Sequence, residues 1–128
     1  MKKPAIVITV AALSLAGSVR AANAGQFDGV YRGELIPGLN SPNCGDRNRR
    51  SAAWTVKNDH LTLHISGRQM DANIAADGSI EGTAHWQIQT YSLENVVYNI
   101  KGKIVNQIID GNAGSQWCSY SFHLVRAK

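Results

Sequence analysis

The sequence predicts an all-β fold, a small antiparallel closed barrel of about eight strands with one disulfide, and a β-sandwich is the alternative. Three observations favour this fold class. Apolar and polar residues alternate with period two along most of the chain, and tight-turn dipeptides separate the alternating runs. No window of about twelve residues supports a helical period as well as it supports a strand period.

The first 24 residues have the composition of a secretory signal peptide. A positive start over 1–3 is followed by a mostly apolar run over 5–16 and by the cleavage site Ala22-Asn23-Ala24. The apolar run is shorter than the about 20 residues that a membrane span needs. We therefore expect a signal peptide at 1–24, a single β-barrel domain at 25–128, no membrane span in the mature chain, and a periplasmic or secreted location.

Removal of the signal peptide changes the charge of the protein. The whole chain has a formal net charge of +4, and residues 1–24 contain three basic residues and no acidic one, so the mature chain has a net charge of +1. A nearly neutral domain without a set of aromatic residues for base stacking is not typical of nucleic-acid-binding proteins. We therefore expect no nucleic-acid partner.

The predicted strands follow from the alternation, taken in chain order. Each run carries an apolar or small residue at every second position, and the runs cover 27–35, 60–66, 70–74, 80–88, 96–104 and 118–124. The dipeptides that predict tight reversals are Asn58-Asp59, Ser66-Gly67, Asp77-Gly78 and Asp110-Gly111. Only residues 91–95 are compatible with a single helical turn.

A short motif, Ile-x-Gly, recurs within these runs. Its glycines are Gly82, Gly102 and Gly111, and their unequal spacing excludes a regular repeat array. A glycine on the inward face of a strand admits a close neighbouring backbone or a bend of the sheet. We therefore expect these glycines where the barrel wall must coil.

The two cysteines, Cys44 and Cys118, are expected to form a disulfide because an exported chain reaches an oxidising compartment. Closing a loop of about 75 residues removes unfolded-state entropy worth about 4.5 kcal/mol. Cys44 follows the first strand and Cys118 begins the last. If these two strands pair antiparallel, the bridge lies where they meet, which favours a meander closed by its terminal strands.

The one long irregular segment, residues 36–51, is the candidate binding surface. It contains Arg47, Arg49 and Arg50, and long irregular segments of compact domains are often functional. Arginine holds carboxylates bidentately, so the segment suits an acidic partner. Trp117, next to Cys118, is the candidate apolar anchor. The alternative is a solvated connection without a partner.

The sequence contains little that supports catalysis or a cofactor. It has no G-x-S-x-G, H-E-x-x-H or glycine-rich phosphate loop, and no cysteine remains free once the disulfide forms. The four histidines all fall on the outward face of the predicted strands, and residues four apart on a strand are separated by about 13 Å. We therefore expect no catalytic residue, no cofactor and no metal site. The histidines are His60, His64, His85 and His123.

Three segments carry a resemblance to known proteins. The opening Phe27-Asp28-Gly29-Val30-Tyr31-Arg32-Gly33, the middle segment at 78–82 and Cys118-Ser119-Tyr120 resemble a group of small exported bacterial proteins of unassigned function. That group has an F-D-G-x-Y-x-G opening, one cysteine after the first strand and a second near the end. In size and in its single disulfide the chain is also similar to periplasmic lysozyme-inhibitor barrels, although their inhibitory motif has no counterpart here.

The function that the sequence favours is that of an exported, non-catalytic binding protein. We expect it to contact an acidic envelope or extracellular partner through the 36–51 segment. Two alternatives are a barrel that carries a small apolar ligand in its interior and a cell-wall-directed hydrolase.

Overall fold

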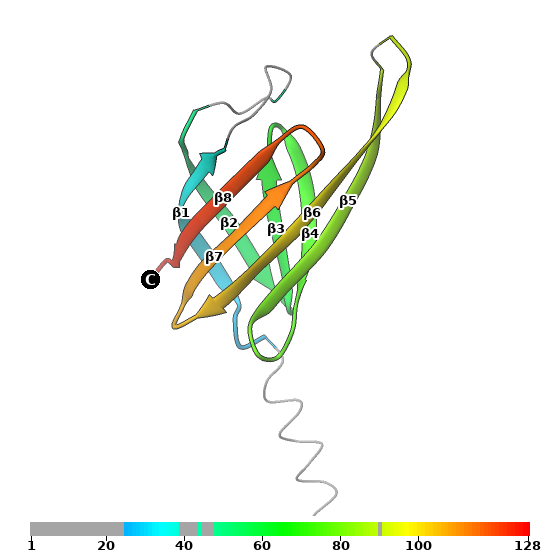
Figure 1. Ribbon diagram of the computed structural model, residues 1–128. Helices are drawn as coiled ribbons and strands as arrows, with labels where there is room; N and C mark the ends of the chain where they lie inside the picture. The colour runs from blue at the N-terminus through cyan, green and yellow to red at the C-terminus, as the bar shows by residue number, and fades with distance from the viewer. Residues whose placement is uncertain (1–24, 39–43, 45–47, 90) are drawn as a thin grey trace, which may run out of the picture.

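The computed structural model describes residues 25–38, 44, 48–89 and 91–128. The predicted signal peptide at 1–24 lies outside the described residues. Eight antiparallel strands form a closed barrel in which each strand pairs with its neighbours in sequence and β1 pairs with β8 (Figure 1). The strands are β1 Gly29–Pro37, β2 Arg50–Lys57, β3 His60–Ile65, β4 Arg68–Ile74, β5 Ser79–Gln89, β6 Leu93–Val105, β7 Ile108–Gly114 and β8 Ser119–Arg126.

The closed barrel confirms the predicted fold class and excludes the sandwich. The terminal strands close the wall, as the position of the cysteines predicted, with a register that runs from Tyr31↔Arg126 to Pro37↔Tyr120. The disulfide is also confirmed, and the two Cα atoms of Cys44 and Cys118 lie 5.8 Å apart. No helical turn forms at 91–95, because the chain enters β6 at Leu93.

Three of the hairpin turns have positive φ at both central residues, the geometry that matches the twist of paired strands. They lie at Asn58-Asp59, Ser66-Gly67 and Asn106-Gln107. The first two were expected from the sequence. The predicted reversal at Asp110-Gly111 is wrong, because these residues lie within β7 and the chain turns at 106–107 instead.

The β4–β5 turn is held by a side-chain cap. The backbone N–H of Ser79 donates to the Asp77 carboxylate at 3.0 Å, and Gly78 adopts a φ of 92° that favours glycine. These hydrogen bonds to Ser79 hold the pKa of the Asp77 carboxyl below its ordinary value. The sequence signal Asp77-Gly78 therefore marks a real reversal.

The core consists of the inward side chains of all eight strands, which meet inside the barrel. Trp54 is 2% exposed and packs edge-on against Phe122, with ring centroids 5.0 Å apart. The Tyr31 hydroxyl donates to the carbonyl of Phe27 at 2.7 Å, which satisfies the one polar atom of this buried ring. The alternating pattern thus predicted the buried face correctly.

Inward glycines allow strands to approach where the wall curves. A Cβ atom at Gly33 would overlap with the backbone carbonyl of His123 on β8, and one at Gly82 would lie 2.6 Å from the carbonyl oxygen of Asp71 on β4. Gly111 is similarly constrained by the ring of Phe122. The recurring Ile-x-Gly motif therefore marks close contacts between strands, as expected.

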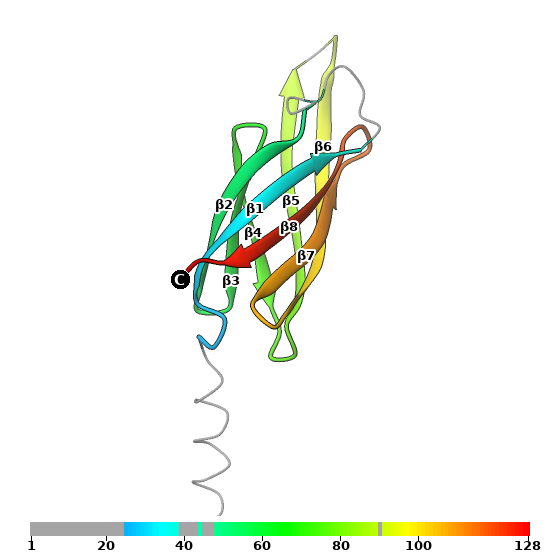
Figure 2. The same cartoon turned by 90° about the vertical axis from the view of Figure 1, so that its left-hand side faces the viewer.

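The β5–β6 hairpin is longer than the other elements of the wall. β5 pairs with β6 from Ser79↔Lys103 to Gln89↔Leu93, and the hairpin extends beyond the rest of the barrel at one end (Figures 1 and 2). Its tip exposes Tyr91 fully and Leu93 at 60%. The barrel therefore has one end that bears a projecting arm.

Candidate functional site

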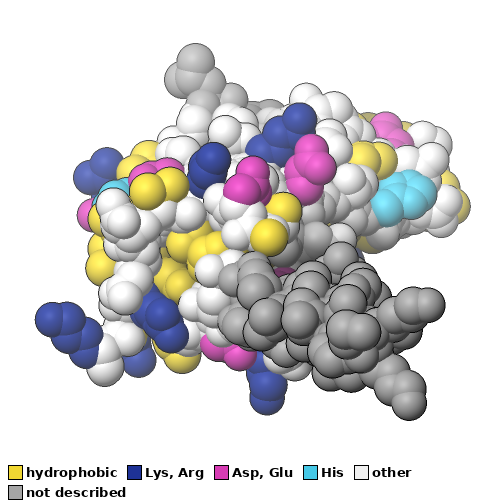
Figure 3. All heavy atoms as spheres, turned by 90° about the horizontal axis from the view of Figure 1, so that it is seen from below, with side chains coloured by type: hydrophobic (Ala, Val, Ile, Leu, Met, Phe, Trp, Pro, Cys, Tyr) yellow, Lys and Arg dark blue, Asp and Glu magenta, His cyan; other side chains and the backbone are white. Residues whose placement is uncertain are grey.

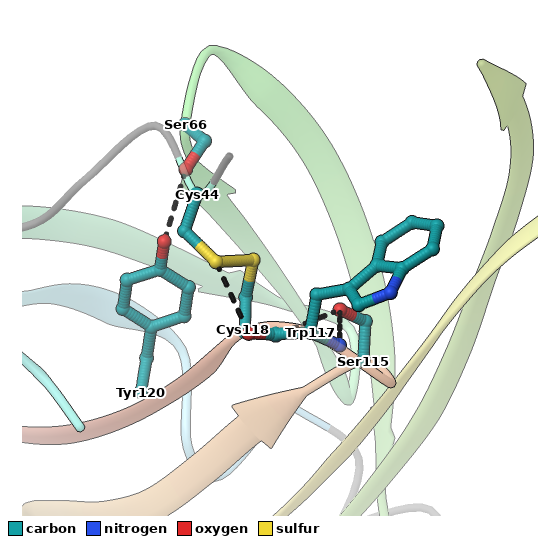
Figure 4. Close-up of a disulfide and its surroundings, with 6 residues drawn as sticks. All are labelled: Cys44, Ser66, Ser115, Trp117, Cys118 and Tyr120. Atoms are coloured by element: carbon teal, nitrogen blue, oxygen red, sulfur yellow. Dashed lines mark hydrogen bonds between the residues drawn. A yellow bond between two sulfur atoms is a disulfide. The ribbon is translucent and has the colours of Figure 1, made fainter. Parts of the chain in front are cut away.

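The end of the barrel that bears the arm also carries the disulfide, and we call it the disulfide end. The connection between β7 and β8 is shaped there by Ser115, whose hydroxyl oxygen accepts the N–H groups of Trp117 at 3.3 Å and Cys118 at 3.2 Å. A sulfur of the bridge, Cys44 Sγ, lies 3.3 Å from the carbonyl oxygen of Trp117. Figure 4 shows the Trp117 ring directed away from the bridge.

A hollow of about 120 Å³ lies between the disulfide and the inner face of the arm. Its volume is near that of a cavity that holds a single benzene-sized group. Most of its described lining is apolar, the disulfide forms one side, and no carboxylate is among the described lining residues. The lining residues are Cys44, Ile65, Ser66, Arg68, Trp86, Ile88, Val96, Tyr98, Ser115, Trp117 and Cys118.

A stack of three side chains forms one wall of the hollow. Trp86 and Tyr98 lie nearly parallel, with centroids 5.2 Å apart and an interplanar angle of 18°. The guanidinium carbon of Arg68 lies 4.6 Å from the Trp86 ring centroid, which is a cation–π arrangement. Among the described residues no carboxylate forms an ion pair with Arg68. Its charge is therefore available to an anionic group that enters the hollow.

A second depression, which we call the β4–β5 groove, adjoins the hollow. The described register between β4 and β5 consists of Asn73↔Glu81 and Ile74↔Ile80, and beyond these pairs the arm diverges from β4 (Figure 1). A space of about 610 Å³ lies between residues 66–69 and 84–86, and the part of its lining that the structure describes contains no acidic residue. Ser66, Arg68 and Trp86 line both the groove and the hollow.

The structure brings together only part of the site expected from the sequence. Trp117 lies beside the disulfide and lines the hollow. Arg47 lies outside the described residues. Arg49 forms an ion pair with Glu34, with Nε and Oε2 3.0 Å apart, and Arg50 is the exposed first residue of β2. Neither of these two arginines lines the hollow.

Arg68 and Trp86 are the residues of this site that the sequence argument missed. Arg68 stands two positions before Met70, so it shares the inward face of β4 with Met70 and Ala72. A cation at an inward position is the signal that could have identified it. Trp86 was expected in the core, but it is half-buried and packs against the core from the hollow.

The histidines lie outside this site or at its margin. All four are exposed, as their parity predicted. His123 contacts the carboxylate of Asp110 across β7 and β8. The described residues include no group of three or more His, Cys, Asp or Glu side chains that could hold a metal ion.

Both ends of the barrel carry charges of both signs. At the end opposite the disulfide, acidic and basic side chains are interspersed (Figure 3). At the disulfide end the described cations are Arg49, Arg50 and Arg68, Glu34 neutralises Arg49, and Glu94 lies on the arm. The cation that lines the hollow is Arg68.

No family model, curated protein or solved structure matches this chain. The part of the chain that the structure describes has no helix of the length and apolarity needed to cross a membrane.

Proposed function

We propose that this protein is a non-catalytic binding protein that holds an acidic partner at the disulfide end of its barrel. The observation that carries the proposal is the apolar hollow bounded by Trp86 and Trp117, with the guanidinium of Arg68, which has no carboxylate partner among the described residues, at its wall. An apolar pocket beside a cation suits a partner that inserts one apolar side chain and presents a carboxylate next to it. Arg50, at the start of β2, would add longer-range attraction.

The size of the hollow favours a protein partner over the alternatives. Sites for small molecules usually measure about 300–1,000 Å³ and are mostly apolar. The hollow measures about 120 Å³, the adjoining groove of about 610 Å³ has a mostly polar lining, and the barrel interior contains the core side chains. This supports a binding surface rather than a carrier of an apolar ligand. A glycoside hydrolase needs two carboxylates that flank its substrate, and the hollow and the β4–β5 groove have none among the lining residues that are described.

The test is capture of a partner from an envelope extract, followed by kinetics with the purified partner. Arg68→Gln should slow association and flatten its salt dependence, whereas Trp117→Ala should speed dissociation by about tenfold or more. Lys103→Gln, at the opposite end of the barrel, is the matched control for loss of one cation. A partner that binds all these variants with unchanged affinity would contradict the proposal.

We also propose that the chain is exported to the periplasm or outside the cell and that the disulfide forms there. The residue pattern over 1–24 and the Cys44–Cys118 bridge support this. Intact-mass analysis of the exported protein should show a chain that begins at Gly25 and lacks the two thiol hydrogens. Retention of residues 1–24, or free thiols in the folded protein, would refute it. Kinship with the small exported barrels and with lysozyme-inhibitor barrels remains a prediction.

A further inference from the structure

The β4–β5 groove contains a strand edge without a described partner. β5 pairs with β6 along its whole length, but its other edge pairs with β4 only at Ile80 and Glu81. At residues 84–86 this edge faces a space of about 610 Å³ that separates it from residues 66–69, and no pairing of β4 with these residues is described. An open edge presents backbone N–H and C=O groups that another strand can bind.

The hydrogen bonds at the start of β5 show which residues point toward this edge. The N–H of Ile104 donates to the carbonyl of Gly78 at 2.9 Å, and the N–H of Ala75 donates to the carbonyl of Ser79 at 2.8 Å. Successive residues of a strand direct their backbone groups to opposite edges. The backbone groups of even-numbered residues of β5 therefore point to β6, and those of His85 and Gln87 point to the opposite edge, where His85 lines the groove.

The charge of the groove indicates what can occupy it. Arg68 is exposed at the start of β4 and has no carboxylate partner among the described residues, and the exposed His85 is the other ionisable residue in the described lining. A second copy of this chain would bring the same cationic groups to the same place. An extended segment with carboxylates instead complements the groove.

We propose that the β4–β5 groove binds an extended, acidic segment of the partner as an added strand on β5, paired with the backbone groups of His85 and Gln87 and contacting Arg68. This rests on the proposed function and specifies how the partner is held. A strand added to β5 would lie about 4.8 Å from it, and the groove lies directly next to the hollow, since Ser66, Arg68 and Trp86 line both. One segment can therefore pair with β5 and direct a side chain into the hollow.

The direct test is an NMR titration of the folded, oxidised protein with a capped seven-residue peptide that alternates aspartate and threonine. The amide protons of His85 and Gln87 should become protected from exchange, whereas those of Ala84 and Trp86, which face β6, are protected already. The same peptide with lysine in place of aspartate should bind more weakly, and Arg68→Gln should reduce this difference. Equal binding of the two peptides, or absence of protection at residues 85 and 87, would overturn the inference.

A matched pair of variants isolates the backbone contact. Gln87→Pro removes the N–H that faces the groove and leaves the pairing with β6 intact, because proline is tolerated where an edge N–H faces away from the sheet. Gln87→Ala keeps this N–H and also removes the side-chain bond to Asn95. Peptide affinity should fall about tenfold in the proline variant and stay within about twofold in the alanine variant. Equal losses in the two variants would contradict strand addition.

The outcomes separate this inference from the proposed function. If Gln87→Pro leaves partner affinity intact while Arg68→Gln and Trp117→Ala weaken it, the proposed function stands and strand addition is wrong. If none of these substitutions changes partner affinity, the proposed function itself is wrong. If the protein dimerises and Gln87→Pro abolishes the dimer, a second copy occupies the edge and the assignment to a partner fails. Where Gln87→Pro does not fold, amide protection in the wild type decides.

Discussion

Replacing both Cys44 and Cys118 with alanine is expected to lower the free energy of unfolding by about 4 kcal/mol. The two residues are separated by 74 positions in sequence, and the bridge restricts the unfolded chain more strongly as this loop lengthens. Alanine is preferred to serine because Cys44 is only 3% exposed, and a buried hydroxyl would add its own cost. Urea unfolding of the oxidised wild type and the variant measures the difference.

Reduction of the wild type is the control for this prediction, since it breaks the bridge without changing the sequence. The reduced wild type and the double alanine variant should agree within about 1 kcal/mol. The variant should also bind the partner more weakly, because the disulfide forms one side of the hollow that Trp117 lines. A stability loss below about 1 kcal/mol would show that the bridge restricts the unfolded chain only weakly.

Gly33→Ala is expected to destabilise the protein by about 3 kcal/mol or more. The added methyl group would overlap with the carbonyl of His123 and lie 2.8 Å from the Cα of Leu124, and these are backbone atoms that no rotamer change can move away. β1 and β8 would have to separate where they close the barrel. Urea unfolding and amide exchange of β1 and β8 measure the effect.

Gly67→Ala is the control for the close approach. Gly67 has a φ of +76° and no atom within 4 Å of a Cβ position, so alanine there incurs only the cost of the left-handed backbone, about 1–2 kcal/mol. Equal losses at Gly33 and Gly67 would mean that backbone conformation, and not contact between the closing strands, determines the cost.

The barrel was predictable from the sequence because its inward residues are large in most strands. The run with Tyr120, Phe122 and Leu124 gives a strong alternation, and all three side chains are buried. β7 gave a weak signal, since its inward positions include Gly111 and Ala113. The dipeptide Asp110-Gly111 has the sequence of a tight turn. The structural reason for a glycine at 111 is different, because a Cβ atom there would overlap with the ring of Phe122.

The candidate site was only partly predictable because it depends on strand register. Trp117 could be found from its position beside Cys118. The stack of Arg68, Trp86 and Tyr98 joins three strands, and alternation alone does not show which strand neighbours which. The arginines of the 36–51 segment were conspicuous in sequence, but Arg49 is engaged with Glu34 on β1.

The pairing of β1 with β8 has a consequence for how the chain reaches its native state. The ladder joins residues 31–37 to residues 120–126, nearly the largest separation that the domain allows. Contacts so distant in sequence form late and slow the folding of a small domain. The entropy cost of closing the loop is incurred before strand pairing lowers the free energy. When the chain emerges with its N-terminus first, one edge of β1 stays unpaired until β8 arrives. During that interval the edge can join the strand of another molecule, so the rate at which the last strand arrives governs aggregation during folding.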